Sequence, residues 1–171
     1  MKIDPVFKRK VLDLMISEHD ISYCYQCGYC NTKCPVYQRV GSRYNPRDLV
    51  LFSLMGYKDA ILNHPDPYAL WGCTACDTCD EVCPAGIPIT EIIDLLKNYA
   101  CAAGKAPAYY PNSAKTIMEN GMAIPVQAAI EKRREKLGLA TSPKIPVEDV
   151  KIIMEACGMP ALIDKCKPGG K

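Results

Sequence analysis

Two runs of cysteine constrain this chain more than any other feature of its sequence. Each run has the spacing C-x2-C-x2-C-x3-C-P, and together they comprise Cys24, Cys27, Cys30, Cys34, Cys73, Cys76, Cys79 and Cys83. This spacing is the ligand pattern of proteins that hold two 4Fe–4S clusters. Three cysteines at intervals of three residues in a tight loop can direct their sulfurs to three irons of one cube. The backbone N–H groups of the same loop then face the cluster sulfurs and stabilise their negative charge.

The fourth cysteine of each run is predicted to bind the cluster of the other run. It directly precedes a proline, which turns the chain and makes closure of the same cube difficult, and in two-cluster proteins it ligates the other cluster. We therefore assign cluster 1 to Cys24, Cys27, Cys30 and Cys83, and cluster 2 to Cys34, Cys73, Cys76 and Cys79. This cross-ligation would hold the clusters close together, as electron tunnelling between them requires.

A structural zinc site is the alternative interpretation of these cysteines. Zinc sites use paired C-x2-C knuckles and close a tetrahedron with four ligands. A third cysteine two residues further on and a terminal Cys-Pro are not part of that pattern, whereas here the full cluster pattern occurs twice without a gap. The sequence therefore favours iron–sulfur clusters over zinc, and favours both over disulfides.

Composition indicates a globular protein of the cytoplasm. The chain has 171 residues, enough for one ordinary domain or a small domain with an appendage. Charged residues such as Lys2, Asp4 and Lys8 occupy the start, where a signal peptide would need an apolar stretch. No run reaches the roughly 18 apolar residues of a membrane-spanning helix. Thiolate ligands also fit a reducing compartment. We expect a soluble cytoplasmic protein without membrane insertion.

The charge balance gives no reason to expect a nucleic-acid partner. The formal net charge is +2, and two oxidised clusters with their thiolates, about −2 each, would bring the loaded protein to about −2. The densest basic stretch, residues 131–136, alternates with acids and is typical of a solvated helix face. No basic groove with interleaved aromatic residues is visible.

Helical signals surround the cysteine runs. Asp4-Pro5 is predicted to begin a helix that continues to Met15, Asn45-Pro46 begins a second that ends at Gly56, and Thr90 caps a third that stops at Gly104. Alternating patterns of β-branched residues are few. The two runs also form an internal repeat of about fifty residues, which suggests a pseudo-twofold arrangement. We predict an all-α fold: an α-helical ferredoxin domain over residues 1–104, with helices bracketing two clusters.

Residues 105–171 are predicted to form a helical C-terminal extension. Turn-rich sequence opens it, and short helices are expected at about 114–120, 126–137 and 147–157. Their apolar stripes are thin, so this segment would bury little apolar surface alone. We expect it to pack on the first domain, on partner subunits or on both. Its final residues, 167–171, are expected to be disordered.

The remaining cysteines and histidines lie outside any ligand pattern. Cys101 and Cys157 are expected to pack in helices, and Cys166 lies in a polar tail, where a reactive thiol is the less favoured interpretation. His19 is placed near the end of the first helix and His64 in a turn.

Aromatic residues gather near the two runs. They are Tyr23, Tyr25, Tyr29 and Trp71, and their expected role is to exclude water from the clusters. Glycine-rich nucleotide motifs and nucleophile elbows are absent from the sequence. We therefore expect no catalytic residue and no substrate site on this chain, which would move electrons only.

Two segments carry a resemblance to a known family. They are Arg-Tyr-Asn-Pro-Arg at 43–47 and the run from Leu70 to Pro84, which is followed by Ile-Pro-Ile-Thr and a helix. Over about residues 20–104 the sequence resembles the iron–sulfur C subunit of the soluble heterodisulfide reductases of methanogenic archaea. The resemblance implies an electron-transfer subunit of an oxidoreductase complex, with the eight motif cysteines as ligands of a relay.

The same resemblance implies particular partners. The large flavin-bearing A subunit would deliver electrons, and the catalytic B subunit, rich in Cys-Cys-Gly elements, would reduce the mixed disulfide of coenzyme M and coenzyme B. A hydrogenase or formate dehydrogenase is a further candidate in a larger assembly. Cys-Cys-Gly elements are absent from this chain, so disulfide cleavage would occur elsewhere.

Two other functions remain open from the sequence. Iron–sulfur subunits of glycolate oxidase, glycerol-phosphate dehydrogenase and fumarate reductase share much of the pattern, so the chain could serve another dehydrogenase. A free, diffusible ferredoxin is the other alternative, although such a carrier has no need of a long helical extension.

Overall fold

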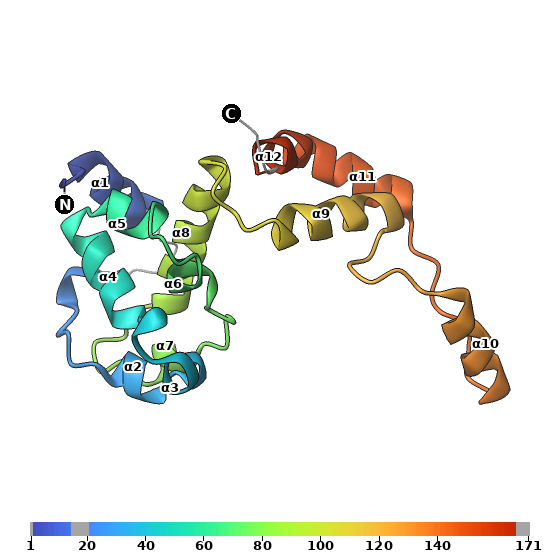
Figure 1. Ribbon diagram of the computed structural model, residues 1–171, viewed down its shortest axis with the longest axis horizontal. Helices are drawn as coiled ribbons and strands as arrows, with labels where there is room; N and C mark the ends of the chain where they lie inside the picture. Colours follow the sequence, from blue (N-terminus) through green and yellow to red (C-terminus); the bar gives the residue numbers. More distant parts are fainter. Residues whose placement is uncertain (1, 15–20, 167–171) are drawn as a thin grey trace. The chain divides into compact units, whose positions relative to one another are not determined.

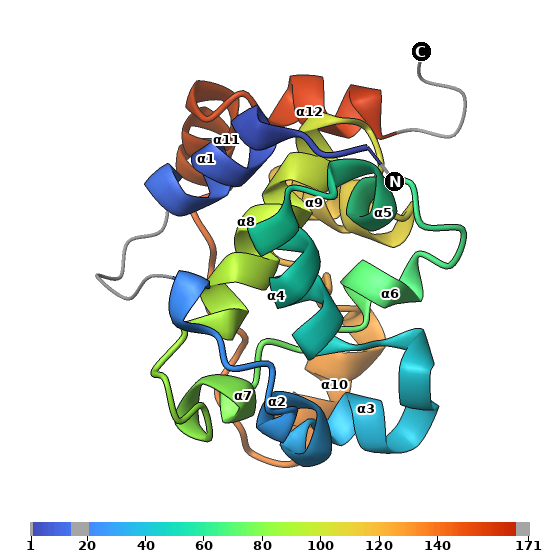
Figure 2. The ribbon, with the colours of Figure 1, turned by 90° about the vertical axis from the view of Figure 1, so that its left-hand side faces the viewer.

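A computed structural model describes residues 2–14 and 21–166 of the chain (Figures 1 and 2). Within these ranges every regular element is a helix, so the predicted all-α fold class is confirmed. The chain divides into two compact units, Met1–Lys105 and Ala106–Lys171. The packing of the second unit on the first or on partner subunits stays a prediction.

The first unit contains short helices around the cysteine runs and longer helices behind them. Its α-helices are α1 (Pro5–Leu14), α2 (Tyr29–Lys33), α3 (Pro35–Val40), α4 (Pro46–Met55), α5 (Lys58–Leu62), α6 (Tyr68–Trp71), α7 (Thr78–Glu81) and α8 (Ile89–Ala102). Two short 3₁₀ helices are η1 (Ile21–Tyr23) and η2 (Gly41–Arg43).

The starts of α1 and α4 follow the capping signals of the sequence. Asp4 accepts a hydrogen bond from the backbone N–H of Phe7 at 2.9 Å, and Asn45 accepts one from Asp48 at 3.1 Å. Gly56 ends α4 in the left-handed conformation, with φ of 72°. Its carbonyl accepts the N–H of Asp4 at 2.8 Å, which fastens the beginning of α1 to the end of α4.

The core of the first unit lies where α1, α4 and α8 contact one another. On α8, Ile92, Ile93 and Leu96 are 0% exposed, and Val11 and Val50 are 1% exposed. In both ribbon views, α1 and α5 lie towards one end of the α4–α8 pair, and α2, α3 and α7 lie towards the other end (Figures 1 and 2). The packed helix pair therefore supports the cysteine runs at one end.

The sequence repeat is also a structural repeat. Helix α2 follows the second cysteine of the first run and contacts α4, and α7 follows the second cysteine of the second run and contacts α8. The two halves meet because α2 contacts α7 and α4 contacts α8. Equivalent helices of the two halves therefore make equivalent contacts, and the pseudo-twofold relation between them stays a prediction.

The beginning of α8 differs from the expectation. The helix begins at Ile89, so Thr90 lies inside it and is not the cap. The cap comes from the cysteine run instead, because Asp80 Oδ1 accepts the Thr90 N–H at 2.9 Å. The first repeat does the same: Asn31 Oδ1 accepts the N–H of Arg47, the second residue of α4, at 3.0 Å. Each long helix is thus fastened to the residue that follows the third cysteine of its own run.

The second unit consists of α9 (Tyr109–Asn120), α10 (Ala128–Lys136), α11 (Val147–Ala156) and α12 (Met159–Lys165). Helix α9 begins earlier than predicted and includes Pro111. A proline is tolerated there because the N–H groups of the first turn have no intrahelical partner. Helix α12 lies beyond the helices that the sequence predicts. Helices α9, α11 and α12 contact one another.

Some expectations fall on residues outside the described ranges. They are the continuation of the first helix to Met15, the place of His19 and the disorder of residues 167–171. Within the described part of the chain, no helix combines the length and apolar character needed to cross a membrane.

Candidate iron–sulfur sites

Two cavities in the first unit are each lined by four cysteines. Cavity 1 has an empty volume of about 350 Å³, including the part open to solvent, and its cysteines are Cys24, Cys27, Cys30 and Cys83. Cavity 2 has about 280 Å³ on the same measure, and its cysteines are Cys34, Cys73, Cys76 and Cys79. In each cavity the fourth cysteine comes from the other run. The structure therefore groups these side chains as the cross-ligated assignment requires.

The donor set of each cavity fits a 4Fe–4S cluster, which is held by four cysteine thiolates. Among the described residues, no three or more Cys, His, Asp or Glu side chains lie close enough together to hold a single metal ion. A single Zn²⁺ needs all its sulfurs about 2.3 Å from one centre. In a 4Fe–4S cluster each cysteine binds a different iron, so the four cysteine sulfurs surround a whole cube and lie further apart than the four sulfurs around one Zn²⁺.

The loops between the cysteines have the same unusual backbone in both runs. Gln26 and Gly28 have φ of 55° and 84°, and the equivalent residues Ala75 and Asp77 have φ of 50° and 57°. A positive φ costs a residue with a Cβ roughly 1–2 kcal/mol. Alternation of right- and left-handed residues turns successive N–H groups to one side and forms an anion-binding concavity. The repeated strain at equivalent positions supports a ligand-holding role for both loops.

Hydrogen bonds already reach several of the cysteine sulfurs. In cavity 1, Gln26 Nε2 donates to Cys24 Sγ at 3.2 Å and the Ile87 N–H donates to Cys83 Sγ at 3.3 Å. These donors would offset negative charge on ligand thiolates, which is one of the factors that set a cluster's potential.

Cavity 2 has comparable donors. The Tyr37 N–H donates to Cys34 Sγ at 3.5 Å, and the Ala75 N–H donates to Cys73 Sγ at 3.4 Å. The buried Tyr44 hydroxyl is hydrogen-bonded to Cys73, and burial raises the Tyr44 pKa far above its usual value. The tyrosine therefore stays a donor. Its part in the site is not apparent from the sequence.

Burial opposes ionisation of the third cysteine in each run. Cys30 and Cys79 are both 9% exposed, and burial raises their pKa values to about 11 and about 12. By contrast, a hydrogen bond from Thr78 lowers the pKa of the exposed Cys76. Metal binding replaces the proton of a thiol, so iron binding at Cys30 and Cys79 should release protons.

The aromatic shield expected around the clusters is only partly present. Tyr25 and Tyr29 line cavity 1, yet they are 71% and 55% exposed, and Tyr23 is 69% exposed. These tyrosines therefore cannot exclude water in the way expected. Trp71 is half-buried against the core. The fully enclosed aromatic residue next to a cavity is Tyr44, which is 2% exposed.

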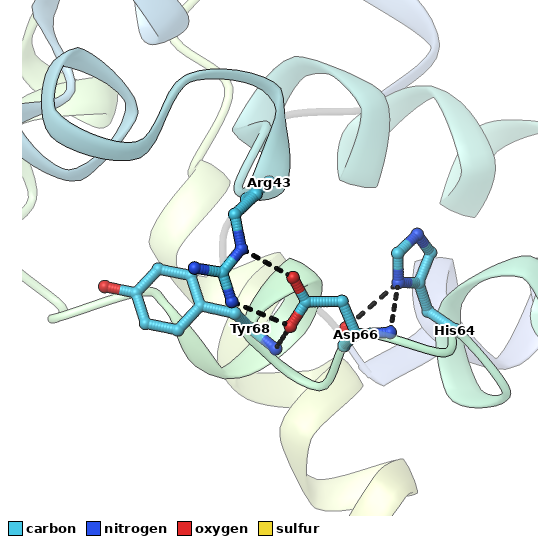
Figure 3. A network of polar contacts seen from close by, with 4 residues as sticks. All are labelled: Arg43, His64, Asp66 and Tyr68. Atoms are coloured by element: carbon cyan, nitrogen blue, oxygen red, sulfur yellow. Dashed lines mark hydrogen bonds and ion pairs between the residues drawn. The ribbon is translucent and has the colours of Figure 1, made fainter.

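An ion pair fastens the loop before the second run to the segment after α3 (Figure 3). Arg43 Nε and Nη2 donate to the two carboxylate oxygens of Asp66 at 2.7 and 3.3 Å, and the Arg43 guanidinium lies 5.1 Å from the Tyr68 ring centre. The hydrogen bond from Arg43 lowers the pKa of Asp66. The His64 ring accepts the Asp66 N–H at 3.1 Å, so His64 shapes this loop.

The three cysteines outside the runs line neither cavity. Cys157 follows the last residue of α11 and is exposed, contrary to the expectation that it packs. Cys166 is 8% exposed, which disfavours a reactive thiol at that position. Cys101 is half-buried at the end of α8.

Serine at these three positions should therefore leave both clusters in place. We expect Cys101→Ser, Cys157→Ser and Cys166→Ser to retain the wild-type ratio of iron to protein after anaerobic purification. Loss of about four irons from any of them would show that the ligand set includes a cysteine outside the two cavities.

Comparison with known proteins agrees with the chemistry of these cavities. Residues 20–87 match the family described as a 4Fe-4S dicluster domain. The chain therefore carries two 4Fe–4S clusters. The matched segment contains both runs and ends before α8.

Curated relatives extend the similarity beyond the cysteine runs. The chain is 30% identical over 167 residues to the C subunit of the H(2):CoB-CoM heterodisulfide,ferredoxin reductase of Methanothermobacter thermautotrophicus, covering 94% of this chain and 86% of the relative. It is 32% identical over 151 residues to the C subunit of the ferredoxin/F(420)H(2)-dependent CoB-CoM heterodisulfide reductase of Methanosarcina acetivorans, covering 86% of each chain. The second iron-sulfur C subunit of the CoB--CoM heterodisulfide reductase of Methanocaldococcus jannaschii is 38% identical over 124 residues, which are 72% of this chain and 63% of that relative.

Proposed function

Because the chain belongs to the family of heterodisulfide reductase C subunits, we propose that it relays electrons within a heterodisulfide reductase complex and holds no substrate itself. The observation that carries this proposal is the grouping of eight cysteines into two neighbouring four-cysteine cavities. Each cluster, when bound, supplies one-electron redox chemistry.

The protein's own residues would set the distance between the two centres. Cys30 and Cys34 lie four residues apart around α2, yet they line different cavities, and Cys79 and Cys83 do the same around α7. Helices α2 and α7 are also in contact. Two cofactors held by such short, crossed segments stay at a fixed short separation, which favours rapid tunnelling between them.

The proposed partners follow from this role. The flavin-bearing A subunit would supply electrons, and the B subunit with Cys-Cys-Gly-rich cluster sites would receive them and reduce the disulfide of coenzyme M and coenzyme B. A hydrogenase or formate dehydrogenase could feed electrons into a larger assembly. The absence of Cys-Cys-Gly elements from this sequence supports assigning the catalytic step to another chain.

Anaerobic purification of the tagged native protein, with identification of every co-purifying chain, tests the partners. We expect to recover a flavoprotein together with a Cys-Cys-Gly-rich protein. If the chain co-purifies with a hydroxyacid dehydrogenase or another quinone-linked dehydrogenase, it is the relay subunit of that enzyme instead. An isolated monomer that reduces several unrelated enzymes would identify a free ferredoxin.

A second experiment separates relay from catalysis. An assembly prepared without this chain should still reduce the disulfide when an artificial one-electron dye donates directly to the catalytic subunit. The same assembly should lose reduction that is driven through the flavoprotein, and addition of the chain should restore it. Loss of the dye-driven reaction as well would contradict the proposal, because it would place part of the catalytic site on this chain.

A further inference from the structure

The two cavities differ in charge at positions that the internal repeat makes equivalent. Gly28 follows the second cysteine of the first run, and Asp77 follows the second cysteine of the second run. Asn31 and Asp80 follow the third cysteine of each run and form the matching hydrogen bonds to α4 and α8, at 3.0 and 2.9 Å. At both positions, the first run has a neutral residue where the second run has a carboxylate.

A third equivalent pair changes the charge in the same direction. The N–H groups that Asn31 and Asp80 bind belong to Arg47 and Thr90, the second residues of α4 and α8. Arg47 lines cavity 1 and Thr90 lines cavity 2. Over the three pairs, the formal charge is +1 in the first repeat (one arginine) and −2 in the second (two aspartates). Asp77 lines cavity 2 but is exposed to solvent, which screens its charge, and Asp80 lies beside the cavity, next to Cys79.

The Arg47 side chain has an unusual environment for an arginine. Its Nε is buried, and within the described part of the chain it is the one buried side-chain nitrogen or oxygen without a hydrogen-bond partner. A Cβ added at Gly28 would lie 4.0 Å from Arg47 Nη1, so the guanidinium lies beside the loop of the first run. A buried N–H without a partner is costly. Arg47 lines cavity 1 although its side chain as a whole is 41% exposed, so the sulfurs of a cluster bound there would offer it acceptors.

Neighbouring ion pairs act on both cavities. Beside cavity 2, Lys97 Nζ donates to the Cys73 carbonyl at 3.2 Å, but it is paired with Asp94 Oδ1 at 3.5 Å, so this pair adds no net charge there. Arg47 Nη2 lies 3.7 Å from Asp48 Oδ1, but the third residue of α8 is also acidic, Glu91, so both repeats carry an acid there. The exposed Lys33 on α2 and Glu81 on α7 add to the difference in the same direction, although solvent screens them.

Neutral donors oppose the charge difference only in part. Besides the Tyr44 hydroxyl at Cys73, cavity 2 has contacts from Thr78 Oγ1 to Cys76 Sγ at 3.4 Å and from Thr90 Oγ1 to Cys79 Sγ at 3.5 Å. Each of these contacts is a dipole that acts on one sulfur, whereas a full charge acts on a whole cluster over a longer distance. Moreover, Asp80 Oδ1 lies 3.4 Å from Cys79 Sγ, so a carboxylate adjoins a ligand sulfur in cavity 2. The charged residues therefore decide the sign of the difference.

We propose that Arg47 gives the cluster of cavity 1 a higher reduction potential than the cluster of cavity 2, whose potential is lowered by Asp77 and Asp80. Reduction adds one negative charge to a cluster, which a nearby cation stabilises and nearby carboxylates oppose. The proposal rests on the proposed cluster ligands. An electron shared by the two centres then resides mainly in cavity 1, so the electron donor meets the relay at cavity 2 and the acceptor at cavity 1.

An anaerobic redox titration followed by electron paramagnetic resonance tests this order in the loaded protein. The wild type should show two separate one-electron steps. Arg47→Gln should lower the higher potential and leave the lower one unchanged, with at least a tenfold change in the equilibrium between the centres, or about 59 mV. Arg47→Lys should restore part of the shift. Arg9→Gln removes the same charge from a side chain that is 80% exposed on α1, and it should move neither potential.

A second variant tests the other cavity without touching Arg47. Asp80→Asn keeps the acceptor for the Thr90 N–H and copies Asn31 of the first repeat, and it should raise the lower potential. Three results would overturn the proposal. The wild type could show a single reduction step, or Asp80→Asn could leave the lower potential unchanged. The third is that Arg47→Gln shifts the lower potential, or shifts both potentials equally. If Arg47→Gln binds the full amount of iron and its two potentials are unshifted, the role of Arg47 is contradicted and the cluster ligands are not. Protein without iron would contradict the cluster ligands themselves.

Discussion

Replacing Cys83 with serine is expected to damage the cluster of cavity 1, although Cys83 belongs to the second run. Cys83 lines the cavity of Cys24, Cys27 and Cys30, and its own run lines the other one. A serine hydroxyl is a far poorer iron ligand than a thiolate. We expect the iron content to fall by about one to four atoms per chain, as one iron or a whole cluster is lost.

Two reference variants identify which cluster has changed. Cys27→Ser removes a ligand of cavity 1 and Cys76→Ser one of cavity 2, and both side chains are exposed, so neither disturbs the core. The low-temperature paramagnetic resonance spectrum of Cys83→Ser should match that of Cys27→Ser. A match to Cys76→Ser would show that each run holds its own cluster, which contradicts the cross-ligation.

Truncation of Leu96 to alanine is expected to cause a large loss of stability. Leu96 is 0% exposed on α8, the helix that contacts α1, α4 and α7 and whose second residue is held by Asp80. Leu→Ala at a buried site typically costs about 2–5 kcal/mol, because apolar contacts are lost and a cavity remains. Anaerobic denaturant titration of the loaded protein, followed by circular dichroism, should show a lower midpoint. The cluster absorbance should be lost in the same transition, since the same helix supports the cysteine runs.

Leu137→Ala is the matched control for this truncation. Leu137 follows α10 in the second unit and is 66% exposed, so the same chemical change should leave the midpoint almost unchanged. Equal midpoints for Leu96→Ala and the wild type would show that α8 does not carry the stability of the cluster domain.

The predictable part of the fold depends on local signals. Asp4, Asn45 and Gly56 define the ends of α1 and α4 through their own side-chain or backbone chemistry, which acts within a few residues and can be read from the sequence. Cysteine spacing is equally local. The pairing of Cys34 and Cys83 with the opposite runs is also accessible, because the proline that follows each of them restricts the chain.

The contacts that could not be predicted connect distant residues. Threonine is a residue type that often caps helices, yet Asp80, ten residues before Thr90, provides the cap of α8. Tyr44 is far from Cys73 in sequence and close to it in the fold. The buried Nε of Arg47 likewise depends on the approach of α4 to the first run. Burial is the natural expectation for the tyrosines next to the cysteines, because aromatic residues usually pack, but the loop turns them outwards.

Iron and acid-labile sulfide, counted in anaerobically purified protein of known concentration, test the central claim most directly. Two 4Fe–4S clusters predict about eight iron atoms and about eight sulfides per chain, with two paramagnetic centres after full reduction. Protein that contains zinc, without iron or sulfide, would contradict the electron relay altogether. About four irons and four sulfides per chain would mean that one of the two cavities holds no cluster.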